Sequence, residues 1–152
     1  MPKAAPAIRT FTTHSSAETE AVGREISALL TPPRLLILKG DLGTGKTTLV
    51  KGIASALDAA DPDEVTSPTF TLVHEYAGVL QGVPVTLLHL DLYRLEGERQ
   101  VDSLGFEDML TSDAIVLVEW GEKFQSIRKR ADGEIAIVSA GGNSRTITVT
   151  LN

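Results

Sequence analysis

Apolar residues recur along the first part of the chain at spacings that predict a helix, a strand and a second helix. Helical spacing over 15–30 predicts the first helix, with Ser15 or Ser16 as its N-cap. The run PRLLILKG (33–40) has a solid apolar centre, as a strand covered on both faces does. A second helical pattern extends from 46 to about 57. This part of the chain therefore predicts a helix followed by a strand, loop and helix unit.

Strand patterns dominate the rest of the chain. The β-rich runs 69–76 and 83–95 are separated by AGVLQG, a connection short enough for a hairpin. The apolar run 114–120 predicts a buried strand, and residues 134–151 alternate on both sides of GGN, which predicts a closing hairpin. Two polar, helix-friendly segments lie between these strands, at 96–100 and 103–110. The pattern predicts an α/β fold whose sheet is mixed, with antiparallel elements beside parallel strands.

Composition and charge narrow the class of protein. The chain has 152 residues, 42% of them hydrophobic, and no repeat or linker, which predicts a single domain over 1–152. It has no cysteine, so disulfides and thiolate zinc sites are excluded, and we expect a cytoplasmic location. Neither a signal peptide nor a membrane-length apolar run is found, so no membrane contact is expected. A net charge of −6 disfavours direct binding of RNA or DNA.

A glycine-rich loop lies between the predicted strand at 33–40 and the second helix. The pattern G-x-x-x-x-G-K-[ST] is met in full by Gly40, Asp41, Leu42, Gly43, Thr44, Gly45, Lys46 and Thr47. Glycines let backbone N–H groups curl towards an anion, and the following helix adds its positive N-terminal end. We expect Lys46 to contact the β and γ phosphates of a nucleotide and the Thr47 hydroxyl to bind Mg²⁺.

Nucleotide chemistry needs a second acid, which usually follows a buried strand and holds Mg²⁺ or aims a water molecule. Two candidates compete for this role, because Asp91 ends VTLLHLD and Glu119 ends AIVLVE. Either acid fits either role, and a solvated charge at a strand end is the simpler interpretation of each one alone. The preferred assignment gives Glu119 a metal-linked role and Asp91 a supporting or water-positioning role.

Other polar and aromatic residues carry weaker signals. SPT at 67–69 predicts a turn from which Ser67 or Thr69 could meet the γ phosphate, although an ordinary turn is the simpler interpretation. Trp120 directly follows Glu119 and is interpreted as a core residue, a shield for the site or a partner contact. Three histidines lack the spacing of metal ligands and are interpreted as packed or surface residues: His14, His74 and His89.

The motifs GDLGTGKTT, SPTFTL, HLDLYRL, LGFED and LVEWGEK, in this order, resemble those of the TsaE family, small bacterial P-loop ATPases of tRNA threonylcarbamoyladenosine synthesis. The resemblance spans most of the chain. It implies a P-loop NTPase-like three-layer sandwich that binds ATP or ADP with Mg²⁺. It also implies a partner, the two-subunit threonylcarbamoyl transferase complex of the TsaD and TsaB families, whose turnover the ATPase supports. Contact with tRNA would be only indirect.

The resemblance assigns roles by position. Its phosphate-binding residues are Gly43, Gly45, Lys46, Thr47 and Thr48, and its Mg²⁺ ligands are Thr47 and Glu119. It makes 67–69 a switch-like segment, and it places Asp91 and Trp120 on positions that matter to activity. Ser16, at the start of the first helix, and Arg145, on the last hairpin, would border the nucleotide.

Three alternatives stay open. A GTPase could use DSLG (102–105) as its D-x-x-G motif, but no apolar strand leads into it and a guanine-reading Asn-Lys-x-Asp is absent, which favours adenine. A small-molecule kinase normally adds a lid, for which little chain remains. A nucleotide-gated docking module overlaps the preferred function, since Arg94 and Arg99 could equally be charge stabilisers or surface residues. Hydrolysis by the isolated protein is therefore expected to be slow.

Overall fold

The computed structural model describes residues 7–41, 43–61, 64–66 and 73–152. Its strands are β1 (Ala7–Thr13), β2 (Arg34–Lys39), β3 (Val73–Leu80), β4 (Val83–Asp91), β5 (Ala114–Glu119), β6 (Gly133–Ser139) and β7 (Arg145–Leu151). Its helices are α1 (Ser16–Ser27), α2 (Lys46–Ala56), α3 (Glu98–Leu104), α4 (Phe106–Met109), the 3₁₀ turn η2 (Gly121–Lys123) and α5 (Gln125–Arg130).

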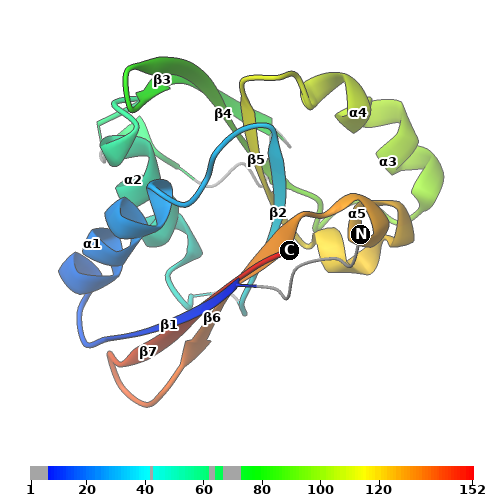
Figure 1. Ribbon diagram of the computed structural model, residues 1–152. Helices are drawn as coiled ribbons and strands as arrows, with labels where there is room; N and C mark the ends of the chain where they lie inside the picture. The colour runs from blue at the N-terminus through cyan, green and yellow to red at the C-terminus, as the bar shows by residue number, and fades with distance from the viewer. Residues whose placement is uncertain (1–6, 42, 62–63, 67–72) are drawn as a thin grey trace.

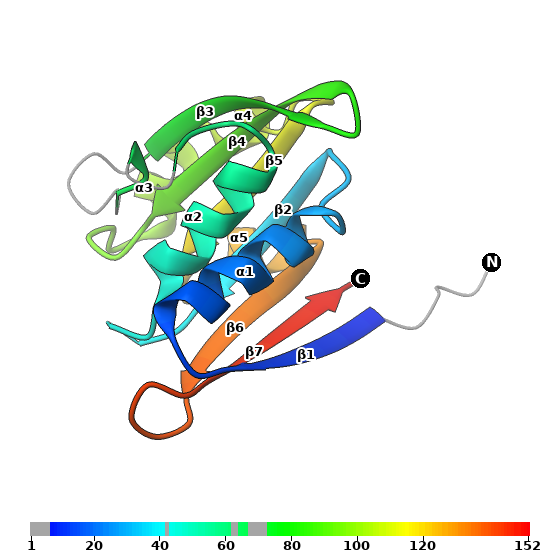
Figure 2. The ribbon, with the colours of Figure 1, turned by 90° about the vertical axis from the view of Figure 1, so that its left-hand side faces the viewer.

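A seven-stranded sheet forms the middle layer, in the order β1-β7-β6-β2-β5-β4-β3. The strands β6, β2, β5 and β4 are parallel to one another. Antiparallel pairing adds β7 and β1 at one edge and β3 at the other. Helices α1 and α2 cover one face of the sheet, and α3, α4 and α5 lie on the other (Figures 1 and 2). The predicted three-layer α/β sandwich with a mixed sheet is confirmed.

The solid apolar centre of β2 follows from its position in the middle of this sheet. Leu36 and Leu38 pack in a core with α1 and α2, whereas Leu35 and Ile37 pack in a second core with α3 and α5. Every residue of β5 is buried as well. Because a central parallel strand is covered on both faces, it cannot alternate apolar and polar residues. The two strands that lead into the candidate site are therefore packed on both faces.

The ends of several elements lie where local signals place them. The Ser15 hydroxyl accepts a hydrogen bond from the Glu18 N–H (3.1 Å), so Ser15 is the N-cap and α1 begins at Ser16. The β3–β4 hairpin is tighter than the sequence suggested, and the prediction of a six-residue connection was wrong. Only Gln81 and Gly82 connect the strands, and both have positive φ (50° and 81°), as a tight two-residue turn requires.

The predicted helical segments at 96–100 and 103–110 were displaced from the observed ones. The structure instead ends α3 at Leu104 and begins α4 at Phe106. Gly105, between them, has φ 67°, a left-handed conformation that stops a helix and that glycine adopts without strain. The break between these helices is therefore set by one glycine.

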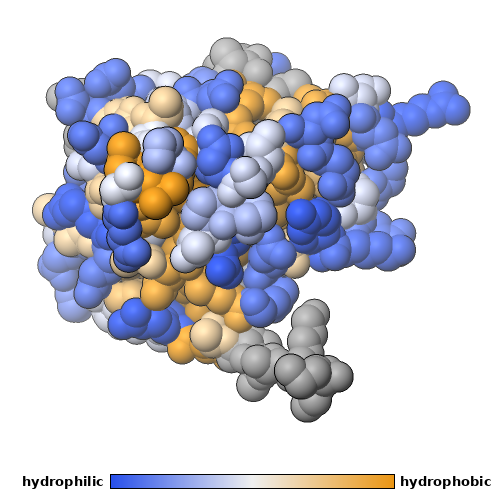
Figure 3. Space-filling model, turned by 45° about the horizontal axis from the view of Figure 1, so that its top comes forward, coloured by the Kyte–Doolittle hydropathy of each residue, from blue (hydrophilic) through white to orange (hydrophobic). Residues whose placement is uncertain are grey.

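Polar and apolar side chains both reach the surface of the sandwich (Figure 3). Figure 3 shows hydrophilic side chains around the outline of one face, with hydrophobic ones gathered between them. Val79 and Val83, beside the β3–β4 turn, are among the exposed large hydrophobic residues. Within the described ranges, no helix combines the length and apolar character that a membrane span needs.

Close backbone packing joins α1 to α2, and it predicts the effect of a small substitution. A Cβ atom on Gly52 would collide with the carbonyl oxygen of Glu20, and one on Gly23 would collide with that of Leu49. We expect Gly52→Ala to lower the free energy of unfolding by about 1–3 kcal/mol, because the strain exceeds the gain in helix propensity. Urea unfolding checks this, with Lys51→Ala in the same helix expected to stay within about 0.5 kcal/mol of wild type.

Candidate nucleotide site

The glycine-rich loop connects β2 to the N-terminus of α2. Gly43 and Gly45 have φ 80° and 106°, a left-handed conformation that glycine accepts and other residues resist. Both the N–H and the hydroxyl of Thr44 donate to the Asp41 carbonyl (3.3 and 2.8 Å), which closes a turn. The loop follows the C-terminal end of β2 and leads into the N-terminus of α2, whose first N–H groups have no partner within the helix. Leu42 lies outside the described residues.

Lys46 is buried beneath this loop. Its side chain is only 7% exposed, and its Nζ donates to the Gly40 carbonyl oxygen at 2.6 Å. The same Nζ lies 3.2 Å from Oε1 of Glu119 and 5.0 Å from the centre of the Trp120 ring. The structure thus brings together two residues that the sequence analysis linked to phosphate and metal.

Glu119 is the last residue of β5 and is held from two sides. Its Oε1 faces Lys46, and its Oε2 accepts a hydrogen bond from Nε2 of His89 at 2.6 Å. Burial by itself raises the pKa of the Glu119 carboxyl. The hydrogen bond from His89 and the favourable electrostatic interactions with His89 and Lys46 outweigh burial and hold this pKa below its ordinary value. Glu119 is therefore an ionised carboxylate in a nearly closed environment.

Asp91 lies beside Glu119, because the two residues pair in the β4–β5 register. Asp91 is buried, and its Oδ1 accepts a hydrogen bond from the Tyr93 N–H at 2.9 Å. The two competing acids thus share one edge of the sheet. They differ in their contacts, since Glu119 touches the lysine of the loop whereas Asp91 bonds the chain that leaves β4.

The donors at this edge fit Mg²⁺ better than a softer metal. Thr47 is in the first turn of α2, and together with the two buried acids it offers hydroxyl and carboxylate oxygens, which Mg²⁺ prefers. In the described ranges, no three His, Cys, Asp or Glu residues are grouped so that they could hold a metal by themselves. Mg²⁺ commonly uses one or two protein ligands and completes its shell with phosphate oxygens and water.

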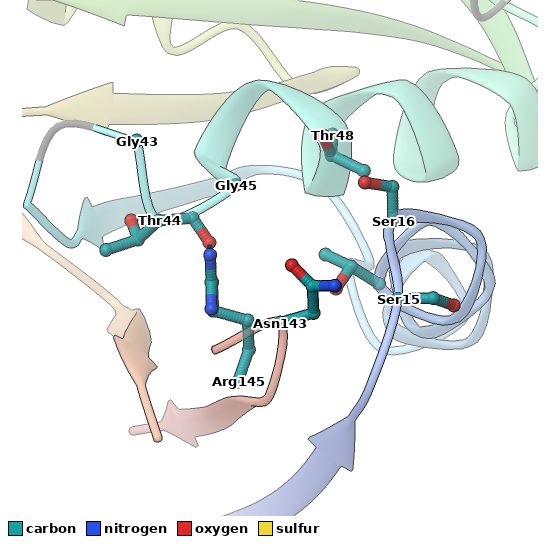
Figure 4. Close-up of a pocket in the computed structure, with 9 residues that line it drawn as sticks. Ser15, Ser16, Gly43, Thr44, Gly45, Thr48, Asn143 and Arg145 are labelled. Atoms are coloured by element: carbon teal, nitrogen blue, oxygen red, sulfur yellow. Dashed lines mark hydrogen bonds between the residues drawn. The ribbon is translucent and has the colours of Figure 1, made fainter. Parts of the chain in front are cut away.

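A cavity of about 280 Å³ lies beside the loop. Three separate parts of the chain converge on it, namely the start of α1, the loop with α2, and the β6–β7 turn (Figure 4). Its lining consists of Ser15, Ser16, Thr19, Gly43, Thr44, Gly45, Thr48, Asn143 and Arg145. Ser16, Thr48 and Arg145, which the resemblance placed near a nucleotide, therefore line one cavity.

Trp120 leaves β5 with φ 64° and lies at the edge of the second core. Its ring is 5.2 Å from that of Tyr93, and it also lines a second hollow, of about 420 Å³, that includes Gly40 and Thr44. Trp120 is thus partly a core residue and partly a cover for Lys46. Ser67 and Thr69, the expected switch residues, lie outside the described residues.

A family model described as threonylcarbamoyl adenosine biosynthesis protein TsaE matches residues 13–147. The chain belongs to the TsaE family. This membership links the chain to the synthesis of threonylcarbamoyladenosine in tRNA.

Curated relatives and a solved structure agree with this membership. The TsaE protein of Bacillus subtilis is 38% identical, over 88% of this chain and 79% of the relative. The TsaE protein of Treponema pallidum is 33% identical, over 89% of this chain and 95% of the relative. The crystal structure of YdiB from Bacillus subtilis superposes with a TM-score of 0.68 at 32% identity, covering 98% of this chain and 88% of that one.

Two residues of this TsaE-family site were missed by sequence reasoning. His89 was interpreted only as packed or exposed, yet it bonds Glu119 from inside the sheet. The available signal was its place two residues before Asp91 in a buried strand, which puts both on one face. Asn143, in the cavity wall, follows two glycines of a turn and carried no signal of a ligand.

Arg145 stabilises the glycine-rich loop of this TsaE-family protein through hydrogen bonds. Its Nε donates to the Thr44 carbonyl (2.9 Å) and its Nη1 to that of Gly142 (2.8 Å). We expect Arg145→Ala to weaken nucleotide binding about tenfold with little change in kcat, because one charge-assisted hydrogen bond that shapes the loop is lost. Titration with a fluorescent ATP analogue measures this, and Arg9→Ala, outside the cavity wall, is the control. Unchanged affinity in Arg145→Ala would contradict this stabilising role.

The lowered pKa of Glu119 predicts how acid affects stability. A carboxyl whose pKa is lower in the folded than in the unfolded chain stabilises the fold above its ordinary pKa of 4.5. That contribution is lost as the pH falls from 4.5 through the folded pKa. Urea unfolding at several pH values between about 3 and 6 should therefore show a steeper acid loss in wild type than in Glu119→Gln. Parallel curves would contradict the ion-paired state.

Proposed function

We propose that this TsaE-family protein binds and slowly hydrolyses ATP with Mg²⁺, and that this cycle supports turnover of the TsaD–TsaB threonylcarbamoyl transferase complex. The observation that carries the proposal is the buried contact of 3.2 Å between Lys46 Nζ and Glu119 Oε1 beneath the glycine loop. A cation and an anion in this position are poised for a phosphate and for the metal that accompanies it. The family's role in tRNA threonylcarbamoyladenosine synthesis supports the choice of partner.

The residues of the loop act by binding and positioning. The N–H groups that begin α2 bind phosphate oxygens, and Lys46 exchanges the Gly40 carbonyl for the β and γ phosphates. Thr47 and Glu119 hold Mg²⁺, which when bound neutralises charge on those phosphates. Because the chain provides charge and alignment, catalysis here rests on electrostatics and position more than on covalent chemistry.

The two acids divide the remaining work. Glu119 takes the metal-linked role because its Oε1 already faces the loop cation. Asp91 takes a supporting role, in which it shapes the chain after β4 through the Tyr93 N–H and helps to orient the attacking water. The contacts of the two acids support this division, which strand position alone left open.

The cavity beside the loop accepts the nucleoside part of ATP. Its wall offers hydroxyl groups from Ser16 and Thr48 and a side-chain amide from Asn143. A GTPase is less well supported, because the DSLG sequence lies on α3 and the turn that ends it, away from the end of any strand. We therefore propose ATP as the nucleotide.

Slow hydrolysis by the isolated protein is part of the proposal. Wherever an arginine from a partner completes such a site, it can raise the rate about 10³–10⁵-fold. The test is ATP hydrolysis by the purified protein, alone and with purified TsaD, TsaB and tRNA. Stimulation that disappears in Lys46→Ala supports a cycle on the partner. Equal rates with and without the partner, with nucleotide still bound, would refute that cycle and leave a nucleotide-gated docking role.

A further inference from the structure

His89 is a fully buried polar residue in the interior of the sheet. It is 0% exposed, and its strand β4 lies between β3 and β5. Its direct neighbours in the register are His74 on β3 and Leu117 on β5. Leu87 and Leu90, close to it on β4, are buried aliphatic residues. A histidine here loses its hydration, which makes its remaining polar contacts important.

The imidazole uses only one of its nitrogens among the described residues. Nε2 donates to Glu119 Oε2 at 2.6 Å, whereas Nδ1 is buried and has no hydrogen-bond partner in the described part of the chain. A residue that served only to hold the sheet together would be better as leucine, because an unsatisfied buried nitrogen destabilises the fold. The polar function of His89 is therefore directed at Glu119.

His89 holds the Glu119 carboxylate through a contact that does not involve Lys46. In this structure the Glu119 carboxylate is oriented by two partners, with Oε1 on Lys46 and Oε2 on His89. Lys46 cannot both pair closely with Glu119 and move to the phosphates. Once Lys46 has moved, His89 alone of these two still fixes the rotation of the carboxylate.

We propose that His89 is a positioning residue that holds Oε2 of Glu119, so that Oε1 stays directed at the site for Mg²⁺ when Lys46 engages the nucleotide. The proposal rests on the proposed ATPase function and adds to it a residue that acts through Glu119. Partners that orient a metal-binding carboxylate typically change metal affinity or activity by about 10–100-fold when they are lost. His89 acts without touching the nucleotide.

Three substitutions separate positioning from packing. His89→Leu fills the space without a donor. His89→Gln places an amide N–H₂ near the position of Nε2, whereas His89→Asn places it near Nδ1, too short to reach Glu119. We expect His89→Leu and His89→Asn to lower kcat about 10–100-fold and to raise the Mg²⁺ concentration for half-maximal rate, with KM for ATP little changed. His89→Gln should recover most of both losses.

A binding measurement complements the rates. A fluorescent ATP analogue is titrated into each variant in EDTA and again in Mg²⁺. We expect His89→Leu to bind the analogue in EDTA as tightly as wild type does, and to lose most of the tightening that Mg²⁺ causes. His89→Gln should restore this tightening.

Leu88→Ala on the same strand is the control for a general loss of packing in the sheet. Leu88 is adjacent to His89 and therefore points to the opposite face, where it packs in the core with α3 and α5. The Leu88→Ala substitution should lower stability while keeping the wild-type response to Mg²⁺. The proposal is overturned if His89→Leu keeps wild-type kcat and Mg²⁺ response, or if Leu88→Ala loses the Mg²⁺ response equally. If His89→Leu does not fold, equal values for His89→Gln and His89→Asn overturn it. A wild type that hydrolyses no ATP refutes the proposed function instead, and the binding titration still tests His89.

Discussion

Lys46→Ala is expected to lower kcat for ATP hydrolysis by at least about 10²–10³-fold, the usual loss when a charged group that stabilises the transition state is removed. The physical reason is that Lys46 is the buried cation beneath the loop, 2.6 Å from the Gly40 carbonyl oxygen and 3.2 Å from Glu119. Nucleotide affinity should fall as well, because the same cation contacts the β and γ phosphates in the bound state. Steady-state kinetics and titration with an ATP analogue measure both effects.

The control for this substitution is Lys51→Ala, which removes a lysine from the same helix outside the loop. Lys46→Ala removes one of the two contacts of the buried Glu119 carboxylate and leaves the hydrogen bond from His89. Thermal unfolding must therefore be measured together with the kinetics. Full ATPase activity in Lys46→Ala would refute the site assignment. Loss of activity together with loss of the folded state would show damage to the fold.

Glu119→Gln is expected to separate metal-dependent turnover from nucleotide binding. The amide keeps the size of the side chain and its hydrogen bond, but it removes the charge that a divalent ion needs. We expect kcat in saturating ATP and Mg²⁺ to fall at least about 100-fold, whereas affinity for the ATP analogue in EDTA should be nearly unchanged. Rates across a range of Mg²⁺ concentrations measure the first quantity, and titration in EDTA measures the second.

Glu107→Gln is the matched control, because Glu107 is an exposed acid on α4 with an ion pair to Arg130. It should behave as wild type in both assays. If Glu119→Gln lost turnover and metal-free binding to the same extent, the role of Glu119 would be structural. Glu119→Ala extends the series by removing the hydrogen bond to His89 as well.

Local sequence signals predicted the architecture and pointed to several residues of the candidate site. The uninterrupted apolar runs of β2 and β5 indicated central strands, because a strand covered on both faces does not alternate apolar and polar residues. The glycine-rich loop could be recognised because its glycines and its Lys-Thr pair are adjacent in sequence. The acids at the ends of β4 and β5 were found by position, since parallel strands bring their carboxyl ends to one edge.

Contacts between distant residues could not be predicted in the same way. The bond between His89 and Glu119 joins residues 30 positions apart through the β4–β5 register. The bond from Arg145 to Thr44 joins residues 101 positions apart and depends on the turn between β6 and β7. Helix α5 was missed for a different reason. It is six residues long with only Ile127 buried, which is too short to show a periodic pattern. The two long-range hydrogen bonds depend on strand register and on turn geometry, which the hydrophobic pattern of the sequence alone does not determine.

An ATP-driven role in the transferase cycle is tested most directly by counting turnovers. A limiting amount of TsaD–TsaB complex is given excess tRNA, threonylcarbamoyl donor and ATP, and the number of threonylcarbamoyladenosine modifications per complex is measured. Wild-type protein and Lys46→Ala are compared at equal concentration. We expect repeated turnover to require the wild-type loop, so that with Lys46→Ala the modification stops after about the first cycle. Equal numbers of turnovers with both proteins would contradict an ATP-driven role for this chain in the transferase cycle.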